Sequence, residues 1–324
     1  MEGELPVAKA KTSVKAASKT AKAAGKKYKV KYKKQNWLEF LCVVPALFFI
    51  LLLNHYPLVE IVRYSFTNWN MLKPDYDYVG FKNWIWLIEK YKSNHVLEAF
   101  ITTIKYTVGH MVIIIGGGML LALLFNRKNK LFDVMRSVIY MPHYIGMSSI
   151  CLVFMWLVNE NFGVFNYMLG WFGVEPVKWL TNGKMALWTI IIMASWKGIG
   201  YDMIIYLSAM SGISTDYYEA AKIDGANGVD IFKKITMPLL APTTLFLCVT
   251  PFIGSMKIFN AVDIMTGGGP NHATEVVVQL IYNLSFEEYR IDRATTISVV
   301  FFVFLVIVTA ATMKWSNRKV NYDA

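Results

Sequence analysis

Ionisable side chains that interrupt apolar stretches are the residues of this sequence best suited to do chemistry. Lys105, His110, Lys197, Asp202 and Lys257 each lie within or at the end of an apolar run. A charge in such surroundings is costly unless it meets water, an opposite charge or a ligand, so these positions are candidates for solute binding. If Lys197 and Lys257 face a common path, they favour an anionic solute. In the alternative interpretation, both lysines extend to a membrane surface and have structural roles.

Patterns for catalysis or metal binding are missing from the sequence. The histidines are scattered, and the three cysteines, Cys42, Cys151 and Cys248, lie in apolar segments without the spacing of metal ligands. The glycine run at 267–269 is not followed by the Gly-Lys-Ser/Thr of a phosphate-binding loop. The sequence therefore predicts that this chain is not an enzyme and that it holds no metal or cofactor of its own.

The composition indicates a membrane protein. Of the 324 residues, 55% are hydrophobic and 17% are charged, whereas soluble domains contain about 25% charged residues. About 20 apolar residues are needed to cross a bilayer, and lone spans must be helical to satisfy their backbone groups. We predict an all-α integral membrane domain over 37–320 with six transmembrane helices, at 40–62, 106–125, 137–159, 185–210, 239–262 and 294–313.

Positive charge indicates how these helices are oriented. Residues 1–36 contain eleven lysines and two acidic residues, which predicts a disordered basic tail. Lysine and arginine also gather in the short segments 126–136, 222–234 and 314–319. Because cytoplasmic loops carry the excess of positive charge, we predict that both termini lie in the cytoplasm. Binding to anionic lipid is an alternative role for the tail, and no nucleic-acid partner is expected.

A polar loop at 211–238 is expected to contact a protein partner. Thr215 or Asp216 is suited to begin a helix, with Glu219 at capping-box spacing from Asp216. Gly225 then permits a sharp turn. A second short helix leads to Pro238, which is tolerated in the first turn of a following span. The loop therefore predicts a cytoplasmic helix–turn–helix, although an ordinary hairpin between spans would share these features.

The spacing in this loop resembles the EAA loop of permease subunits of ATP-binding-cassette importers. Glu-Ala-Ala at 219–221 is followed by Gly225 and by Ile-Thr-Met-Pro at 235–238, where the family has Ile-x-Leu-Pro. The resemblance implies that the loop docks on a separate ATPase subunit, which binds ATP and Mg²⁺. The positions expected to make this contact are Glu219, Ala220, Ala221, Asp224, Gly225 and Pro238.

Three further segments resemble carbohydrate permeases of the maltose type. They are VGFKNW at 79–84, YMPHYI at 140–145 and TGGGP at 266–270. YMPHYI resembles the branch that handles complex oligosaccharides, which includes alginate-type importers. Together the motifs extend the resemblance over 37–320, nearly the whole chain outside the basic tail.

The resemblance implies a pore subunit in a bacterial inner membrane, which passes oligosaccharide inwards by alternating access. Its expected partners are a second permease in a heterodimer, two ATPase subunits and an external solute-binding protein. Motif anchoring places the substrate path at Gly198, Ile199, Asp202, Gly254, Ser255 and Ile258, beside Lys197 and Lys257. A uronate oligosaccharide would suit the two lysines. The alternative class, an ion-driven secondary transporter, would need carboxylates in the bundle, where Asp202 is nearly alone.

Overall fold

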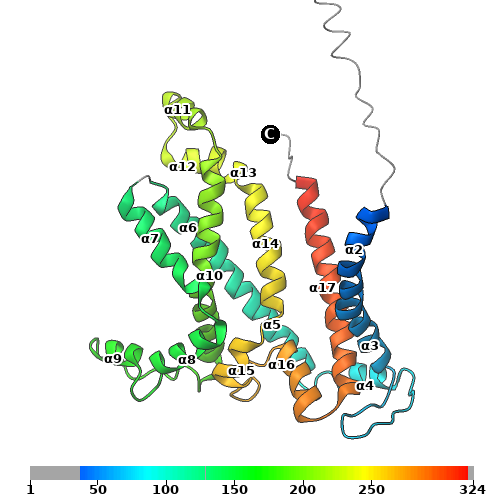
Figure 1. Ribbon diagram of the computed structural model, residues 1–324. Helices are drawn as coiled ribbons and strands as arrows, with labels where there is room; N and C mark the ends of the chain where they lie inside the picture. Colours follow the sequence, from blue (N-terminus) through cyan, green and yellow to red (C-terminus); the bar gives the residue numbers. More distant parts are fainter. Residues whose placement is uncertain (1–36, 128, 320–324) are drawn as a thin grey trace, which may run out of the picture. The chain divides into compact units, whose positions relative to one another are not determined.

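The computed structural model describes residues 37–127 and 129–319, with side chains described for 41–127 and 129–314. The predicted basic tail at 1–36 lies outside the described residues. The secondary structure of the described residues is helical (Figure 1). Their only β feature is an isolated bridge between Thr67 and Tyr78. The predicted all-α class is confirmed.

The chain divides into two compact units, residues 1–58 and 59–324. Within the first unit, α2 (Trp37–Ile50) continues through a π-helical turn, η1 (Leu51–His55), into the start of α3 (Tyr56–Tyr64). The apolar helix Leu41–Tyr64 is long enough to cross a membrane. It matches the first predicted span, 40–62.

The second unit contains the rest of α3 and all later elements. Their bounds are α4 (Lys82–Lys90), α5 (Val96–Met111), η2 (Val112–Gly116), α6 (Gly117–Phe125), α7 (Lys130–Tyr140), η3 (Met141–Tyr144), α8 (Met147–Leu157), α9 (Val164–Gly170), α10 (Gly183–Ser211), α11 (Thr215–Ile223), α12 (Gly228–Ile231), η4 (Phe232–Thr236), α13 (Met237–Leu239), α14 (Ala241–Met256), α15 (Asn260–Thr266), α16 (Val277–Tyr282), η5 (Asn283–Glu287) and α17 (Ile291–Lys319).

Helix α10 is the centre of the second unit. It packs against α5, α6, α7, α14 and α15. Its 29 residues extend about 43 Å at 1.5 Å per residue, which exceeds the roughly 30 Å hydrocarbon core of a bilayer. Glycines allow its neighbours to approach closely. A Cβ at Gly118 of α6 would lie 2.7 Å from Cβ of Asp202, and a Cβ at Gly200 would lie 2.4 Å from the Ile139 carbonyl oxygen.

Two of the six predicted spans are bent rather than straight. Four described helices are long and apolar enough to cross a membrane, and six are reached only if each of two bent pairs counts as one span. The third predicted span, 137–159, is divided between Lys130–Tyr144 and Met147–Leu157, which meet at 102°. Pro142 in a 3-10 turn and the extended backbone at Ile145 and Gly146 interrupt the helix.

The fifth predicted span, 239–262, is also interrupted. A bend of 62° separates Gly228–Leu239 from Ala241–Met256, and α14 then ends at Met256, before α15 begins at Asn260. The prolines Pro238 and Pro242 stand on either side of the bend, where each lacks a backbone donor. The second span is longer than predicted, because the helix begins at Val96 rather than at residue 106.

Candidate functional site

The loop at 211–238 forms the predicted helix–turn–helix, with one correction at its start. Ser214, not Thr215 or Asp216, caps α11, because its extended backbone lets the hydroxyl oxygen accept a hydrogen bond from the Asp216 amide at 3.3 Å. The turn after α11 is as predicted. Gly225 has φ +78°, in the left-handed region, and its amide donates to the carbonyl of Lys222. This is the glycine-terminated end that many helices use.

The second arm of the loop returns to the membrane helices. The side chain of Asn227 accepts hydrogen bonds from the amides of Val229 and Asp230 and so caps α12. The hydroxyls of Tyr218 and Thr236 lie 3.4 Å apart and join the two arms. Local sequence signals therefore define a hairpin whose arms are held together, at the end of α10 (Figure 1).

The predicted partner-contacting residues lie on an exposed surface of this hairpin. Glu219, Ala220, Asp224, Gly225 and Pro238 are exposed, and Ala221 is half-buried. The sequence analysis did not single out Ile223, whose side chain is 86% exposed at the end of α11. A large apolar side chain with that exposure on a polar loop is a further feature expected of a contact surface.

Lys197 supports the break in the third span. Its ammonium donates a 2.7 Å hydrogen bond to the carbonyl oxygen of His143, in the 3-10 turn before the bend. A helix end leaves carbonyl groups without intrahelical partners, and lipid offers them none. The His143 ring also stacks between Tyr140 and Tyr201, with centroids 5.3 and 5.0 Å away. Lys197 forms no ion pair with Asp202, five residues further along α10.

Two of the predicted path residues, from different helices, meet at His110 of α5. The Ser255 hydroxyl lies 3.4 Å from His110 Nδ1, and a Cβ at Gly198 would lie 4.0 Å from the same imidazole ring. His110 is therefore the point at which Gly198 and Ser255, two candidate substrate-path residues that are distant in the sequence, come close together. Gly254 and Lys257 are exposed, and Ile258 is half-buried against the cluster formed by α5, α8, α10 and α15.

Ile199 and Asp202 lie against α6 instead. A Cβ at Gly117 would lie 2.5 Å from Cδ1 of Ile199, and Asp202 packs on Gly118. Asp202 is buried, and its Oδ2 atom has no hydrogen-bond partner among the described residues. The Cβ and backbone of Asp202 therefore form part of the α6–α10 contact, beneath a buried carboxyl group.

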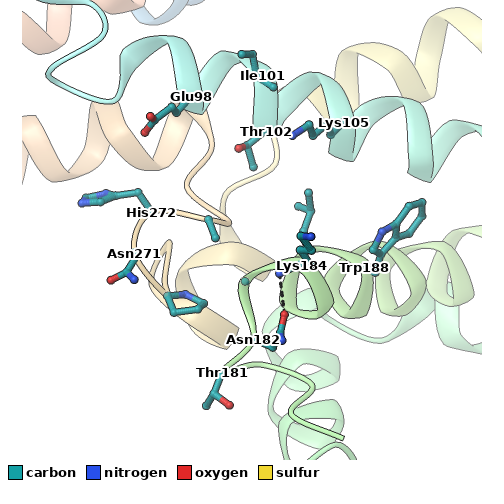
Figure 2. Close-up of a pocket in the computed structure, with 14 residues that line it drawn as sticks. Glu98, Ile101, Thr102, Lys105, Thr181, Asn182, Lys184, Trp188, Asn271 and His272 are labelled. Carbon is teal, nitrogen blue, oxygen red and sulfur yellow. Dashed lines mark hydrogen bonds between the residues drawn. The ribbon is translucent and has the colours of Figure 1, made fainter.

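A cavity of about 1170 Å³ opens at the end of α10 opposite to the loop at 211–238. Its walls are the first two turns of α10, the outer face of α5 and the loop at 270–273, as Figure 2 shows. Charged and aromatic side chains line it, namely Glu98, Lys105, Lys184, Trp188 and His272. We call it the α5–α10 cavity. Of this set, the sequence analysis singled out only Lys105, because Lys184 and Trp188 occupy an ordinary helix start.

The loop that closes this cavity has a well-defined conformation. The Thr274 hydroxyl donates to the Gly269 carbonyl at 2.7 Å, and the Thr274 amide donates to the Gly268 carbonyl. Asn271 and His272 at its tip have φ of 50° and 60°, a region that non-glycine residues seldom adopt and that is frequent at functional sites.

Comparison with known proteins places this architecture in a family. The model of the family "Binding-protein-dependent transport system inner membrane component" matches residues 114–322. The probable starch degradation products transport system permease AmyD of Thermoanaerobacterium thermosulfurigenes is 31% identical over 90% of this chain and 98% of its own length. The probable ABC transporter permease y4oQ of Sinorhizobium fredii is 31% identical over 82% of this chain and 86% of its own length.

A solved structure has the same fold. It is a chain of a bacterial ABC transporter involved in the import of the acidic polysaccharide alginate, with a TM-score of 0.79 and 24% identity over 89% of this chain and 98% of that chain. The matched family region includes the central helix α10 and the loop at 211–238. The chain belongs to the family of inner membrane components of binding-protein-dependent transport systems, and it is a permease subunit rather than an enzyme.

Proposed function

We propose that this chain is a pore subunit of an ATP-driven importer that moves an oligosaccharide from an external binding protein into the cytoplasm by alternating access. Its partners are a second, related permease, two ATPase subunits that bind ATP and Mg²⁺, and the binding protein. The names of relatives support a carbohydrate, since AmyD is named for starch degradation products and AraP of Halalkalibacterium halodurans for arabinooligosaccharides.

The observation that carries this proposal is the position of α10. The helix begins at the α5–α10 cavity, and three residues separate its last residue from the start of α11. Because α10 is a continuous helix of 29 residues, a displacement of the loop at 211–238 is transmitted as a rigid-body movement to the cavity wall. Alternating access by rocking of helix bundles needs such a connection. In this assignment the loop and both termini are cytoplasmic, and the cavity opens outwards.

The exposed hairpin supports contact with an ATPase subunit. Nothing lies within 4 Å of a Cβ built at Gly225, so the first atom of a side chain there meets no atom of this chain. Asparagine and aspartate tolerate the left-handed conformation that Gly225 adopts. Because any side chain at this φ is strained, a defect of Gly225→Asp is assigned to the contact with a partner only where the variant permease is inserted and its Tm is unchanged.

The test is ATP hydrolysis by the reconstituted complex with its binding protein and oligosaccharide. We expect Gly225→Asp to abolish substrate-stimulated hydrolysis or to release the ATPase subunits during purification, while the permease remains inserted. Gly228→Ala is the matched control, since Gly228 lies in the same loop without a positive φ and without a contact at its Cβ. Full stimulated activity in Gly225→Asp would refute the coupling role.

A narrower proposal is that the oligosaccharide is acidic. In the sequence, two lysines support this proposal. Lys197 and Lys257 were expected to attract a uronate. The ammonium of Lys197 is bound to the His143 carbonyl, and Lys257 is an exposed residue at the end of α14. Neutral and acidic oligosaccharides are therefore compared in the same hydrolysis assay, and stimulation by neither would refute the carbohydrate substrate.

A further inference from the structure

The α5–α10 cavity combines three kinds of side chain that an acidic sugar needs. Lys105 and Lys184 supply ammonium groups, Trp188 supplies a flat aromatic face, and Thr102 and Asn271 supply polar groups for hydroxyls. These residues come from α5, α10 and the loop at 270–273 (Figure 2). Sites for small ligands characteristically join an aromatic surface to a few placed polar groups.

The position of Lys105 is the first argument for a water-filled site. Lys105 is the tenth residue of the apolar helix Val96–Phe125, and its side chain is exposed. It lies one residue before the apolar run 106–125, at the edge of the span, where an ammonium group can reach water, a partner or a ligand. Lys105 lines the cavity together with Lys184 from the start of α10. In the described part of the chain, neither ammonium group has a carboxylate oxygen within 4.0 Å.

The acidic side chain of the lining does not neutralise these lysines. Glu98 contacts the ring of His95, at 2.5 Å from Oε2 to Nδ1. The His95 ring in turn stacks on His272, with centroids 4.2 Å apart. Figure 2 shows the Glu98 carboxylate on the His272 side of the cavity and Lys105 further along α5. The lining therefore has two ammonium groups without a carboxylate partner and one carboxylate that is already engaged.

The aromatic side chain is free to take part in binding. Trp188 is 53% exposed, and it lies on α10 across the opening from Lys105 (Figure 2). It also borders an adjoining apolar groove of about 620 Å³, lined by Val108, Val112 and Ile191. Trp188 therefore stands where the charged lining ends and the apolar lining begins, a suitable place for the face of a sugar ring.

The walls of the cavity are held in place by contacts that do not involve these side chains. A Cβ at Gly183 would lie only 2.7 Å from Cβ of Ala273, so the loop and the start of α10 are in close contact. The Thr103 hydroxyl accepts a hydrogen bond from the Val277 amide at 3.0 Å, which fixes α5 to the segment after the loop. The two lysines thus project from fixed elements.

We propose that Lys105 and Lys184 form an anion subsite that receives the carboxylate of an acidic sugar residue as it enters the permease, with Trp188 against the sugar ring. This subsite rests on the proposed importer function. It is a second candidate, beside Lys197 and Lys257, for the binding of an acidic substrate.

A reagent assay tests the charge of the site without any sugar. In the assembled complex, with Cys42, Cys151 and Cys248 replaced by serine, Trp188→Cys serves as the reporter. We expect an anionic methanethiosulfonate to modify it faster than a cationic one of similar size. The ratio of the two rates should fall at least about fivefold in Lys105→Gln/Lys184→Gln, because the loss of two positive charges slows the anionic reagent and speeds the cationic one. Lys178→Gln, which removes an exposed lysine outside the lining, is the matched control and should leave the ratio unchanged.

A second measurement identifies the ligand. Trigalacturonate should stimulate ATP hydrolysis by the wild-type complex, and the double glutamine variant should lose at least tenfold in half-saturating concentration for it. Response to a neutral trisaccharide, where present, should be unchanged. If the ratio of the two modification rates is the same with and without the two lysines, the subsite is refuted while the importer function stays intact. A retained anion preference without stimulation by any oligosaccharide refutes the proposed substrate class, and with it the sugar subsite.

Discussion

Replacement of Lys197 by methionine separates the two roles that a lysine in the middle of α10 can have. Methionine keeps an unbranched side chain of similar length and removes the charge and the donors. In the structure, the ammonium group holds the His143 carbonyl at the break between η3 and α8. If this bond is the purpose of Lys197, the substitution will destabilise the permease. If Lys197 instead meets substrate, stability will be preserved and transport will fail.

The expected size of the effect follows from the contact. Hydrogen bonds to charged groups contribute about 1.5–3 kcal/mol. Lys197 is half-buried, so the lower half of this range, about 1.5–2 kcal/mol, is appropriate. At about 2–4 °C per kcal/mol for a domain of 150–250 residues, Tm should fall by roughly 3–8 °C.

The assay is thermal unfolding of the purified complex in detergent, measured beside substrate-stimulated ATP hydrolysis at a temperature well below Tm. Lys257→Met is the control. Lys257 is exposed, so this substitution should change the free energy of unfolding by less than about 0.5 kcal/mol and leave Tm nearly unchanged. An unchanged Tm in Lys197→Met together with a loss of stimulated hydrolysis would refute the structural role and restore Lys197 to the substrate path.

Two further predictions concern the helices that pack on α10. Gly200→Ala should destabilise the permease by about 1–3 kcal/mol, because its methyl group would lie 2.4 Å from a backbone oxygen of α7. Gly198→Ala, whose methyl group would lie no closer than 3.5 Å to a side chain, should stay within about 1 kcal/mol of wild type, and equal Tm losses in both variants would contradict this. Asp202→Asn should keep transport, since the Cβ and backbone of Asp202, which asparagine retains, pack on Gly118 and asparagine has nearly the same volume. Loss of uptake with normal stability in Asp202→Asn would instead favour an ion-driven transporter.

Much of the fold was predictable because lipid imposes a simple rule on the chain. A span must be apolar and helical, so hydropathy placed all six segments close to helices of the structure. Hydropathy does not report bends. The break at 145–146 depends on where the Lys197 ammonium meets η3 and where Gly200 meets α7, and such contacts join residues more than 50 positions apart.

The loop at 211–238 was the more predictable of the two candidate sites, for a physical reason. Its shape depends on caps and on a left-handed glycine, which are signals within a few residues of one another. Even so, the cap is Ser214 rather than Thr215 or Asp216, because serine is a better N-cap than threonine and Ser214 has the extended backbone that a cap requires. The α5–α10 cavity had no such local signal. Lys105, Lys184 and His272 come from three distant segments, and only packing brings them together.

Helix α5 carries both His110, which lies beside two predicted substrate-path residues, and Lys105, which lines the cavity. Motif anchoring selected Gly198 on α10 and Ser255 on α14 separately, and the structure places both beside His110 of α5. Lys105 lies five residues earlier on the same helix and lines the cavity. Five residues of helix correspond to about 7.5 Å along its axis. The same five residues rotate the helix by about 140° beyond one full turn. Lys105 and His110 therefore project from different faces of α5, and the cavity and the residues that the family resemblance selected lie against different faces of this helix.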